Sequence, residues 1–378
     1  MGTEHPLPFV TVLVPCRNEA RFIEGCLKSV LNNGYPADRL ALLVVDGMSE
    51  DGTREVLDGY ARTYPCLRVM DNPGRTTPKA LNLGLREAQG EVVLRVDAHA
   101  RLDPGYIRRC VEALREYSAD VVCGVMRTVP GAASRVGEAI AAALRHPFGV
   151  GNSYFRIHVS HPTWVDTVFC GCYRREVFDR VPAPRIAAGR SQGPAASIPA
   201  DRQGPFNAAL TRGQDMDFSL RLRKVGGRML LVPDIKCDYY ARSTLRSFWR
   251  HNWNNGVWAI LPFAYSDGMP ISLRHLIPLF FVAAVPTTAA AGIAVRPFLW
   301  LSGAILGAYC MVSAAASLHA AWIEKSFARL VMMPFVFATL HLSYGLGSLW
   351  GLARLMRLPP FWKKMGLGGD GRPSAVES

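Results

Sequence analysis

The hydrophobic positions of the first 126 residues form short apolar runs separated by segments with helical spacing. The runs FVTVLVP, LALLVVD, LRVM, EVVLRVD and ADVVCGVM are rich in Val and Leu and have the length of buried strands. Between them, residues 22–31 and 106–114 repeat apolar side chains every three or four positions, which predicts amphipathic helices. This alternation predicts an α/β fold, with a mostly parallel sheet flanked by helices.

Longer apolar stretches follow beyond residue 270, at about 276–295, 298–318 and 330–352. Each is close to the ~20 residues that cross a bilayer as a helix, so we predict transmembrane helices within 271–353. Three crossings from a cytoplasmic domain would place the basic tail 354–378 outside, against the positive-inside rule. Because the first stretch contains Pro278 and Pro286, it is our candidate for a broken, re-entrant or hairpin element.

Composition divides the remaining chain further. Residues 181–213 are rich in Pro, Gly, Ala and Ser, which predicts a flexible loop or insertion. Residues 242–270 interleave arginines with Trp and Phe, which predicts an amphipathic interfacial segment. The first residues lack a charged region followed by an apolar core, so we expect the domain formed by residues 1–241 to stay in the cytoplasm.

Charge and cysteine content narrow the class of protein. The net charge of +13 suits anionic lipid, phosphate-bearing substrates or nucleic acid. The sequence shows no zinc finger, RNA-recognition signature or basic repeat, so we expect a membrane and phosphate-bearing substrates and no nucleic acid. Nine cysteines without a C-x-x-C pair indicate reduced thiols in a cytosolic compartment.

Polar side chains follow several predicted strands at the point where each strand ends. Ligands of a parallel α/β sheet bind beyond the carboxyl ends of its strands, so these side chains are candidates for a binding site. Taken singly, each is also explained as a helix cap or turn residue. They are Pro15, Arg17, Asn18 and Glu19 after the first strand, Asp46 after the second, and Asp97 and His99 after the fourth.

With these clusters, residues 9–260 resemble the family 2 glycosyltransferases of GT-A fold, and most closely the bacterial exopolysaccharide enzymes of the succinoglycan glucosyltransferase type. The segments that carry the resemblance are VPCRNEARFIEGCLKSVL, VVDGMSEDGT, NPGRTTPKALNLGL, RVDAHAR, VDTVFCGCYRREVFD and GQDMDFSLRLRKVGG. The resemblance implies a bacterial inner-membrane enzyme whose catalytic domain, residues 1–241, faces the cytoplasm. It implies that the enzyme transfers a hexose, with inversion, from a nucleotide-diphosphate sugar to a polyprenyl-diphosphate-linked acceptor. We expect the donor to be UDP-linked and the product to enter exopolysaccharide or cell-envelope glycan synthesis.

The resemblance also implies roles on the donor side. Asp97 and His99 would take the family's Asp-x-Asp position and hold a divalent cation, Mn²⁺ or Mg²⁺. The softer imidazole nitrogen favours manganese, and the alternative is that His99 caps a turn or hydrogen-bonds a phosphate. The residues expected to bind the nucleotide sugar are Pro15, Arg17, Asn18, Glu19, Asp46, Arg75, Lys79, Asn82 and Asp97.

An inverting transferase also needs a general base for the acceptor hydroxyl. Helical spacing places Asp215 on a stripe with Phe218 and Leu222 that faces the protein, whereas Asp217 lies four residues before Arg221 and would form a surface pair. We therefore predict Asp215 as the base, although it could be only an acid at a helix N-terminus. Gln214 departs from the family pattern, which has an acidic residue there.

The acceptor or membrane side is expected to include Asp166, Gly171, Arg246, Arg250 and Trp253. Two alternatives remain at this point. HNWNNGVW stands where processive polysaccharide synthases carry Gln-x-x-Arg-Trp, so the chain could be such a synthase with few crossings. The altered Asp-x-Asp and Gln214 positions would also suit a non-catalytic sugar-nucleotide-binding membrane scaffold.

Overall fold

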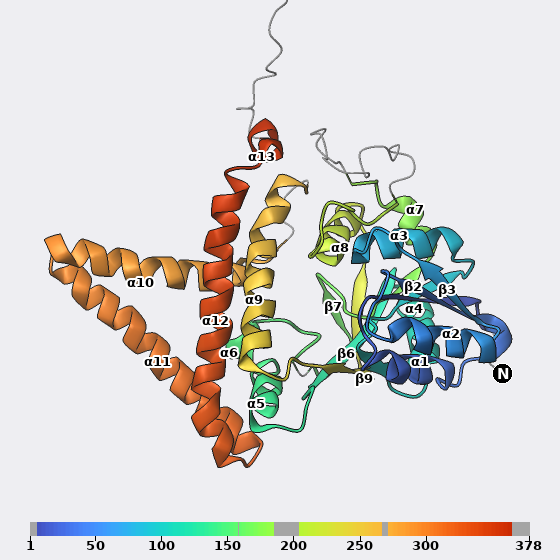
Figure 1. Cartoon of the computed structure of the whole chain (residues 1–378), viewed down its shortest axis with the longest axis horizontal. Coiled ribbons are helices and arrows are strands. Elements are labelled where there is room, and N and C mark those ends of the chain that lie inside the picture. Colours follow the sequence, from blue (N-terminus) through green and yellow to red (C-terminus); the bar gives the residue numbers. More distant parts are fainter. Residues whose placement is uncertain (1–5, 158, 185–203, 267–270, 365–378) are drawn as a thin grey trace, which may run out of the picture.

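The computed structural model describes residues 6–157, 159–184, 204–266 and 271–364 (Figure 1). Most of the predicted loop 181–213 and most of the basic tail lie outside these residues. The described chain forms one mixed sheet with helices on both faces, followed by long apolar helices on one side of the sheet domain (Figure 1). The sheet order is β3-β2-β1-β4-β8-β6-β9-β5, with β7 also paired to β9.

The N-terminal half of the sheet follows the predicted alternation. β1 pairs in parallel with both β2 and β4, and β2 pairs in parallel with β3. The strands here are β1 (Val10–Cys16), β2 (Leu40–Asp46), β3 (Leu67–Asp71) and β4 (Val92–Arg95). The helices between them are α1 (Ile23–Leu31), the short 3-10 turn η1 (Ala37–Arg39), α2 (Thr53–Thr63) and α3 (Thr77–Glu87).

The second half of the sheet is mixed, so the expectation of a mostly parallel sheet holds only for the first half. β8 runs antiparallel to both β4 and β6, whereas β6 and β9 are parallel; β5 and β7 are antiparallel to β9. The strands are β5 (Ala100–Leu102), β6 (Val121–Val129), β7 (Thr163–Val165), β8 (Cys172–Arg174) and β9 (Met229–Tyr240). The helices are α4 (Tyr106–Glu116), α5 (Arg135–Ala143), α6 (Pro147–Val150), α7 (Glu176–Arg180) and α8 (Gln214–Lys224).

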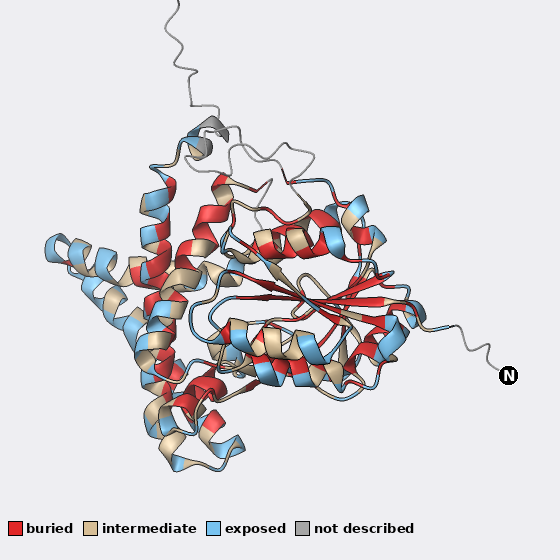
Figure 2. Ribbon diagram, turned by 45° about the vertical axis from the view of Figure 1, so that its right-hand side comes forward, coloured by how far each residue is buried: buried red, intermediate tan, exposed pale blue. Residues whose placement is uncertain are grey.

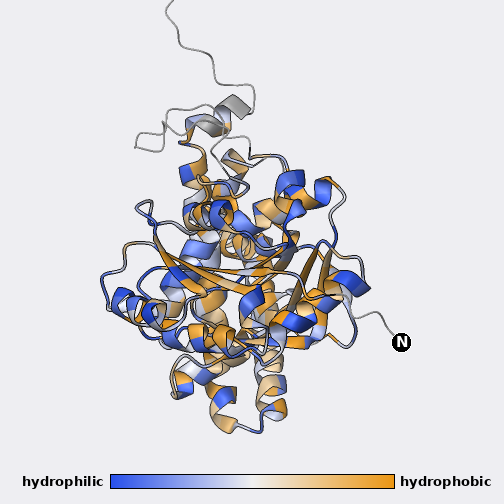
Figure 3. Cartoon of the chain, turned by 90° about the vertical axis from the view of Figure 1, so that its right-hand side faces the viewer, coloured by the Kyte–Doolittle hydropathy of each residue, from blue (hydrophilic) through white to orange (hydrophobic). Residues whose placement is uncertain are grey.

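The core lies on both faces of the sheet because the central strands are apolar on both faces. Val12 and Val14 pack with the cluster that includes α1 and α4, while Leu13 faces the opposite cluster with α3. The helix α3 approaches so closely that a Cβ on Gly84 would lie 2.0 Å from a methyl carbon of Leu13. Figures 2 and 3 show the strands as buried and hydrophobic, with polar helix faces outward. This rigid layer fixes where the strand ends lie.

The C-terminal helices form a separate layer beside the sheet domain. Helices α9 and α12 run side by side, and α10 and α11 project away from the sheet (Figure 1). Although Pro286 lies inside it, α10 is a continuous helix, so the prediction of a broken element is wrong; a tight turn at Arg296 joins it to α11 as a hairpin. The elements are α9 (Leu245–Ile260), η4 (Leu261–Ala264), η5 (Leu273–His275), α10 (Ile277–Ala294), α11 (Pro297–Ile323), α12 (Phe327–Leu355) and α13 (Pro359–Lys364).

These apolar helices are suited to a bilayer. Among the described residues, Leu273–Ala294, Pro297–Ile323 and Phe327–Leu355 are long and apolar enough to cross one. Few residues are buried in the most apolar parts of the first two, 11% in each, whereas 39% are buried in the third. The exposed side chains include Phe280, Trp300, Trp322 and Phe335. Such a continuous apolar surface is far larger than soluble proteins expose, so the protein associates with a membrane.

Candidate active site

Hydrogen bonds that involve the buried carboxylate of Asp46 link the loops at the carboxyl ends of β1 and β2. Its Oδ1 accepts a hydrogen bond from the Ser49 hydroxyl at 2.5 Å, and the Ser49 backbone N–H lies 3.2 Å from Oδ2. The Ser49 hydroxyl oxygen in turn accepts from the backbone N–H of Asn18 at 2.9 Å. The predicted strand-end residues therefore meet in one hydrogen-bonded cluster.

The loop after β1 depends on an unusual backbone conformation. Asn18 has a φ of +55°, and its side-chain oxygen accepts from the backbone N–H of Glu50 at 2.9 Å. Asn is one of the few residues that adopts this left-handed region readily. The next residue, Glu19, donates its backbone N–H to the Thr53 hydroxyl at 2.8 Å. Its side chain is thereby left free to point toward the end of β4.

The other predicted donor residues lie at different depths. Pro15 is buried within β1, and exposed Arg17 packs over Gly47. Arg75 is exposed, with Nη1 3.7 Å from Oε1 of Glu50. Lys79 lies over Gly74, where a Cβ would come within 2.3 Å of the lysine Cδ.

Asn82 is used structurally. Its side-chain amide donates to the backbone oxygen of Phe206 at 2.7 Å, and its oxygen accepts from the Phe206 N–H at 2.9 Å. Because the residue is buried and both amide ends are engaged, Asn82 holds the 204–206 segment in place. The structure therefore does not support the predicted donor contact for Asn82.

The end of β4 places an imidazole against a carboxylate. His99 Nδ1 lies 3.0 Å from Oε1 of Glu19, and the ring packs edge-on against Tyr239. Burial lowers the pKa of His99, but the hydrogen bond to Glu19 and the negative charges of Glu19 and Asp97 outweigh it and raise that pKa. When Nδ1 donates its proton to Glu19, Nε2 is the nitrogen that remains for a ligand.

Asp97 is held in its ionised form. Burial raises the pKa of Asp97, but the charges of Arg95 and His99 and a 3.0 Å hydrogen bond from Arg95 Nη2 outweigh that and lower it. An ionised carboxylate is the form that binds a cation.

The pair Asp97 and His99 fits a divalent cation bound mainly by substrate. Within the described residues, no group of three His, Cys, Asp or Glu side chains is placed to hold a metal. The contact between His99 and Glu19 nevertheless matches a common metal-site arrangement, in which a ligating histidine donates its other N–H to a carboxylate. Such a site supplies two protein ligands and leaves the other positions to phosphate oxygens and water.

Asp215 and Asp217 have exchanged the environments predicted for them. The Asp217 side chain is only 2% exposed and forms an ion pair with buried Arg221, at 2.8 Å from Nη2; the pair was predicted, but its surface location is wrong. The Asp215 side chain is 34% exposed and does not share the buried face of Phe218. Its Oδ2 lies 3.9 Å from Nη1 of Arg95. Arg95 therefore lies between Asp97 and Asp215.

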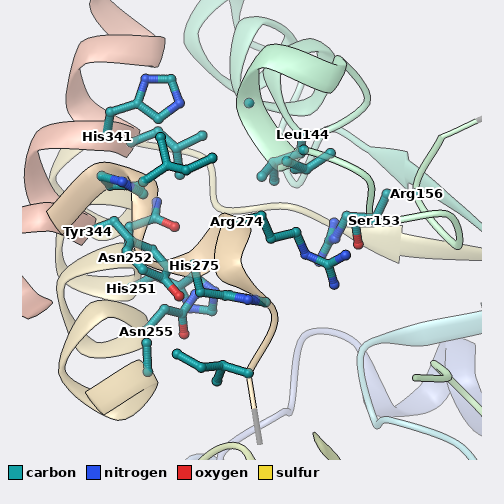
Figure 4. Close-up of a pocket in the computed structure, with 18 of the residues that line it drawn as sticks. Leu144, Ser153, Arg156, His251, Asn252, Asn255, Arg274, His275, His341 and Tyr344 are labelled. Atoms are coloured by element: carbon teal, nitrogen blue, oxygen red, sulfur yellow. The ribbon is translucent and has the colours of Figure 1, made fainter. Parts of the chain in front are cut away.

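Asp215 also faces a cavity of about 640 Å³ between the sheet domain and the C-terminal helices (Figure 4). Its polar part is lined from α9 by His251, Asn252 and Asn255, with Arg156 and Arg274 across from them in the view. Its apolar part reaches α10, α11 and α12, where it is lined by Pro278, Phe281, Tyr309, Leu340 and Tyr344. One cavity thus connects a partly exposed carboxylate with the helices that carry the apolar surface.

The predicted acceptor residues lie mostly outside this cavity. Arg246 and Arg250 are exposed on α9, and Trp253 packs against Val257 in the cluster with α12 rather than toward the cavity. Asp166 accepts from the Ser272 hydroxyl at 3.2 Å and lines a smaller neighbouring cavity. Gly171 is packed against the Tyr173 ring, and its carbonyl accepts the Arg95 N–H at 2.9 Å.

Several site residues were missed from sequence. Arg95 belongs to a predicted apolar strand, and a charged residue at the end of such a strand is itself a signal of a functional site. His251 and Asn255 lie in the segment noted for its arginines and tryptophans. Arg156, Arg212 and Arg274 are far apart in sequence, and no local pattern brings them together.

Comparison with known proteins places this geometry in a family. Residues 11–181 match the family model described as Glycosyl transferase family 2. The succinoglycan biosynthesis protein ExoA of Rhizobium meliloti is 26% identical over 332 residues, which cover 82% of this chain and 92% of that protein. The dolichyl N-acetyl-α-D-glucosaminyl phosphate 3-β-D-2,3-diacetamido-2,3-dideoxy-β-D-glucuronosyltransferase of Methanococcus voltae is 22% identical over 247 residues, 64% of this chain and 69% of that protein.

The fold is also found among solved structures. A mannosyltransferase from Pyrobaculum calidifontis, solved in complex with GDP-Man and Mn²⁺, aligns with a TM-score of 0.50 and 22% identity, over 91% of this chain and 87% of that chain. This likeness confirms the predicted GT-A architecture. Together with the family match, it leads to one conclusion: residues 11–181 of this chain form a domain that matches the Glycosyl transferase family 2 model.

Proposed function

We propose that this protein transfers a hexose from a nucleotide-diphosphate sugar to a lipid-linked acceptor, with inversion, at the cytoplasmic face of a bacterial inner membrane. The observation that carries the proposal is the position of Asp215. It lies 3.9 Å from Arg95, which also pairs with Asp97, and it lines the cavity that leads to the apolar helices. The name of the Methanococcus voltae relative, a transferase acting on a dolichyl-linked sugar, agrees with an acceptor carried on lipid, and the name of the Rhizobium meliloti relative agrees with polysaccharide synthesis.

On the donor side, the hydrogen-bonded loops after β1 and β2 would hold the nucleoside through Asn18 and Asp46. Asp97 and Nε2 of His99 would hold a divalent cation, and Glu19 would keep the imidazole in the required tautomer. When bound, the cation neutralises charge that develops on the leaving diphosphate. We propose UDP as the nucleotide and Mn²⁺ as the preferred ion.

On the acceptor side, Asp215 would take the proton of the attacking hydroxyl. Its exposure to the cavity would let an acceptor hydroxyl reach it directly. Oδ1 accepts the Met216 backbone N–H at 3.0 Å and Oδ2 lies 3.9 Å from Nη1 of Arg95, so the carboxylate is positioned without a close ion pair. Asp217 is not suited to this role, because its side chain is buried and its charge is paired with Arg221. Access from the cavity therefore supports Asp215 as the base, independently of its helix face.

The experiment is a comparison of Asp215→Asn with the wild type in detergent, using a panel of labelled nucleotide sugars and extracted polyprenyl-diphosphate saccharides. A positioned base contributes about 10²–10⁴-fold to rate, so we expect transfer to fall by that factor while nucleotide affinity changes little. Product length on the same gels would separate single transfer from processive synthesis. Full transfer by Asp215→Asn would overturn the proposal.

A further inference from the structure

The polar part of the cavity is strongly cationic. It is lined by four arginines from four different parts of the chain, namely Arg156, Arg212, Arg242 and Arg274. None of them forms an ion pair with a carboxylate among the described residues. Asp215 is the single carboxylate among the described side chains that line this cavity.

The partners of these arginines are neutral. Arg212 Nη1 donates to the side-chain oxygen of Asn255 at 2.8 Å, and Arg274 Nη1 donates to that of Asn152 at 2.7 Å. Arg156 lies over the Tyr239 ring. Burial lowers the pKa of both Arg156 and Arg212, as expected of guanidinium groups that lack a compensating charge. A buried cation without a counterion is costly, and a bound anion would remove that cost.

His251 supplies an independent sign of a missing ligand. It lines the same cavity from α9, and its buried Nδ1 has no hydrogen-bond partner among the described residues. Burial, together with the positive charges of Arg212, Arg242 and Arg156, lowers the pKa of His251 to about 3. A neutral imidazole nitrogen enclosed by cations is expected to bond to a ligand, since buried polar atoms rarely lack a partner.

We infer that this cavity binds the phosphate groups of the acceptor lipid, with Arg156, Arg212, Arg242 and Arg274 around the anion and the first isoprenoid units against Phe281, Tyr309 and Leu340. The inference rests on the proposed function and adds the recognised chemistry: an isoprenoid phosphate or diphosphate. Guanidinium groups suit phosphate because they donate two parallel hydrogen bonds. The apolar part of the cavity lies where the helices meet the bilayer, so the tail would remain in lipid.

The test measures binding, without sugar transfer, so that it does not depend on the proposed reaction. Farnesyl diphosphate, inorganic pyrophosphate, farnesol and UDP are titrated into the full chain in detergent. Arg242→Gln is the first variant because Arg242 is exposed and its loss leaves the packing intact. Hydrogen bonds to charged groups predict about 10- to 100-fold weaker binding of farnesyl diphosphate and of pyrophosphate for Arg242→Gln or Arg274→Gln.

Controls distinguish a site for the lipid phosphate from a site for the donor nucleotide. Arg62→Gln, at an exposed position on α2, should leave all four affinities unchanged. Farnesol should bind weakly and equally to all variants, because it lacks the phosphate. If Arg242→Gln and Arg274→Gln weaken UDP as much as farnesyl diphosphate, the cluster belongs to the nucleotide donor and the inference fails. Unchanged farnesyl diphosphate affinity in both variants would also overturn it, whether or not Asp215→Asn abolishes transfer.

A separate observation concerns how the protein sits in the membrane. α12 packs against α5 and α9 over much of its length, although its composition suits a bilayer. Near its start, Arg329 lies 3.8 Å from Glu138 of α5; in its middle, Phe337 packs with Ile140. Toward its end, Gly347 and Gly351 allow close backbone contact with α9. α9 exposes Arg246 and Arg250, which the hydrocarbon of a membrane would not accept.

Both ends of the α10–α11 hairpin are tied to the sheet domain. At its start, Ser272 donates to Asp166 at 3.2 Å and Arg274 contacts Asn152. At its end, Glu324 accepts a hydrogen bond from Arg145 at 2.5 Å. Between these points the two helices extend away from the sheet (Figure 1), and Arg296 lies in the turn that joins them. The 18 residues of α10 are about 27 Å long at 1.5 Å per residue, close to the hydrocarbon thickness of a bilayer.

We propose that α10 and α11 cross the bilayer as a hairpin, whereas α12 lies along the membrane surface beneath the catalytic domain. The arrangement uses two crossings, so the basic segment beyond Arg354 stays on the catalytic side. It removes the conflict with the positive-inside rule that three crossings create. The apolar side chains that α12 exposes, among them Phe335, Leu342 and Trp350, would enter the near leaflet.

Reporter fusions and cysteine labelling test this topology in bacterial cells. Green fluorescent protein fused to the C-terminus should fluoresce, and alkaline phosphatase fused there should be inactive. With Arg296→Cys, a membrane-impermeant maleimide should label the chain in intact cells, whereas the half-buried native Cys66 should react only after permeabilisation. Active phosphatase at the C-terminus would show a third crossing. Failure of Arg296→Cys to react in intact cells would show that the hairpin does not cross.

Discussion

Replacing Asp217 by asparagine should destabilise the fold without removing the proposed catalytic base, Asp215. Asp217 is almost fully buried, and Arg221 binds its Oδ2 through Nε at 3.0 Å and Nη2 at 2.8 Å. Arg221 also donates to the backbone oxygens of Pro182 and Pro205. Asp217→Asn would therefore leave a buried guanidinium uncompensated, beneath the chain segments that meet at α8.

The size of the expected loss of stability follows from the burial of both Asp217 and Arg221. Breaking a buried ion pair by removing one charge costs about 3–5 kcal/mol. For a domain of this size, 1 kcal/mol shifts Tm by about 2–4 °C, so the variant should melt roughly 6–20 °C below the wild type. Asp215→Asn should melt within about 2 °C of the wild type, because its carboxylate is partly exposed and 3.9 Å from its nearest cation.

The assay pairs thermal unfolding in detergent with transfer rate per folded molecule at low temperature. We expect Asp217→Asn to have a lower Tm and most of the wild-type transfer rate. We expect Asp215→Asn to have the wild-type Tm and a much lower transfer rate. The double variant Asp217→Leu/Arg221→Met should recover much of the lost Tm, because apolar side chains can replace a buried ion pair at little cost. An Asp217→Asn enzyme with normal Tm and no transfer would refute both the assignment of the base and the energetic argument.

Other predictions test the metal and the contact between helices. His99→Asp should lower the ratio of manganese-supported to magnesium-supported activity, because an oxygen ligand replaces nitrogen; full activity of His99→Ala at low manganese would reduce His99 to a turn residue. Gly256→Ala should lower Tm and sugar transfer together, since its Cβ would lie 2.0 Å from the carbonyl oxygen of Tyr344 on α12. Gly25→Ala is the matched control: a Cβ there meets no atom within 4 Å, so differential scanning fluorimetry should show an unchanged or slightly raised Tm.

The sequence predicted the first half of the sheet well because that half is built from local alternation. Each parallel strand is a short apolar run followed by an amphipathic helix, and the polar residues at its end are next to it in sequence. β8 and β5 have only three residues each, too few to show a period, and their partners are distant in the chain. β9 begins with a run of only four apolar residues before Pro233, and it was not predicted.

Periodicity gives the face of a helix on which a residue lies but not what covers that face. In α8, a loop segment around Phe206 covers the face that bears Asp217 and leaves Asp215 toward the cavity, which helical spacing alone did not reveal. In α9, the predicted residues Arg246, Arg250 and Trp253 do not line the cavity, whereas His251 and Asn255 of the same helix do. In α12, composition indicates a membrane span, and it does not show that Gly347 and Gly351 pack closely on α9.

Selectivity for a lipid over soluble phosphates follows from the two halves of the cavity acting together. A soluble anion such as pyrophosphate would gain only the guanidinium contacts, which salt and competing anions weaken. An isoprenoid phosphate would add burial of its tail, at about 0.8 kcal/mol per methylene transferred from water. A tail already in the bilayer gains less than this, so the helices would act mainly by holding the headgroup at the depth of Asp215. On this reasoning, shortening the lipid should weaken binding in detergent more than in membranes.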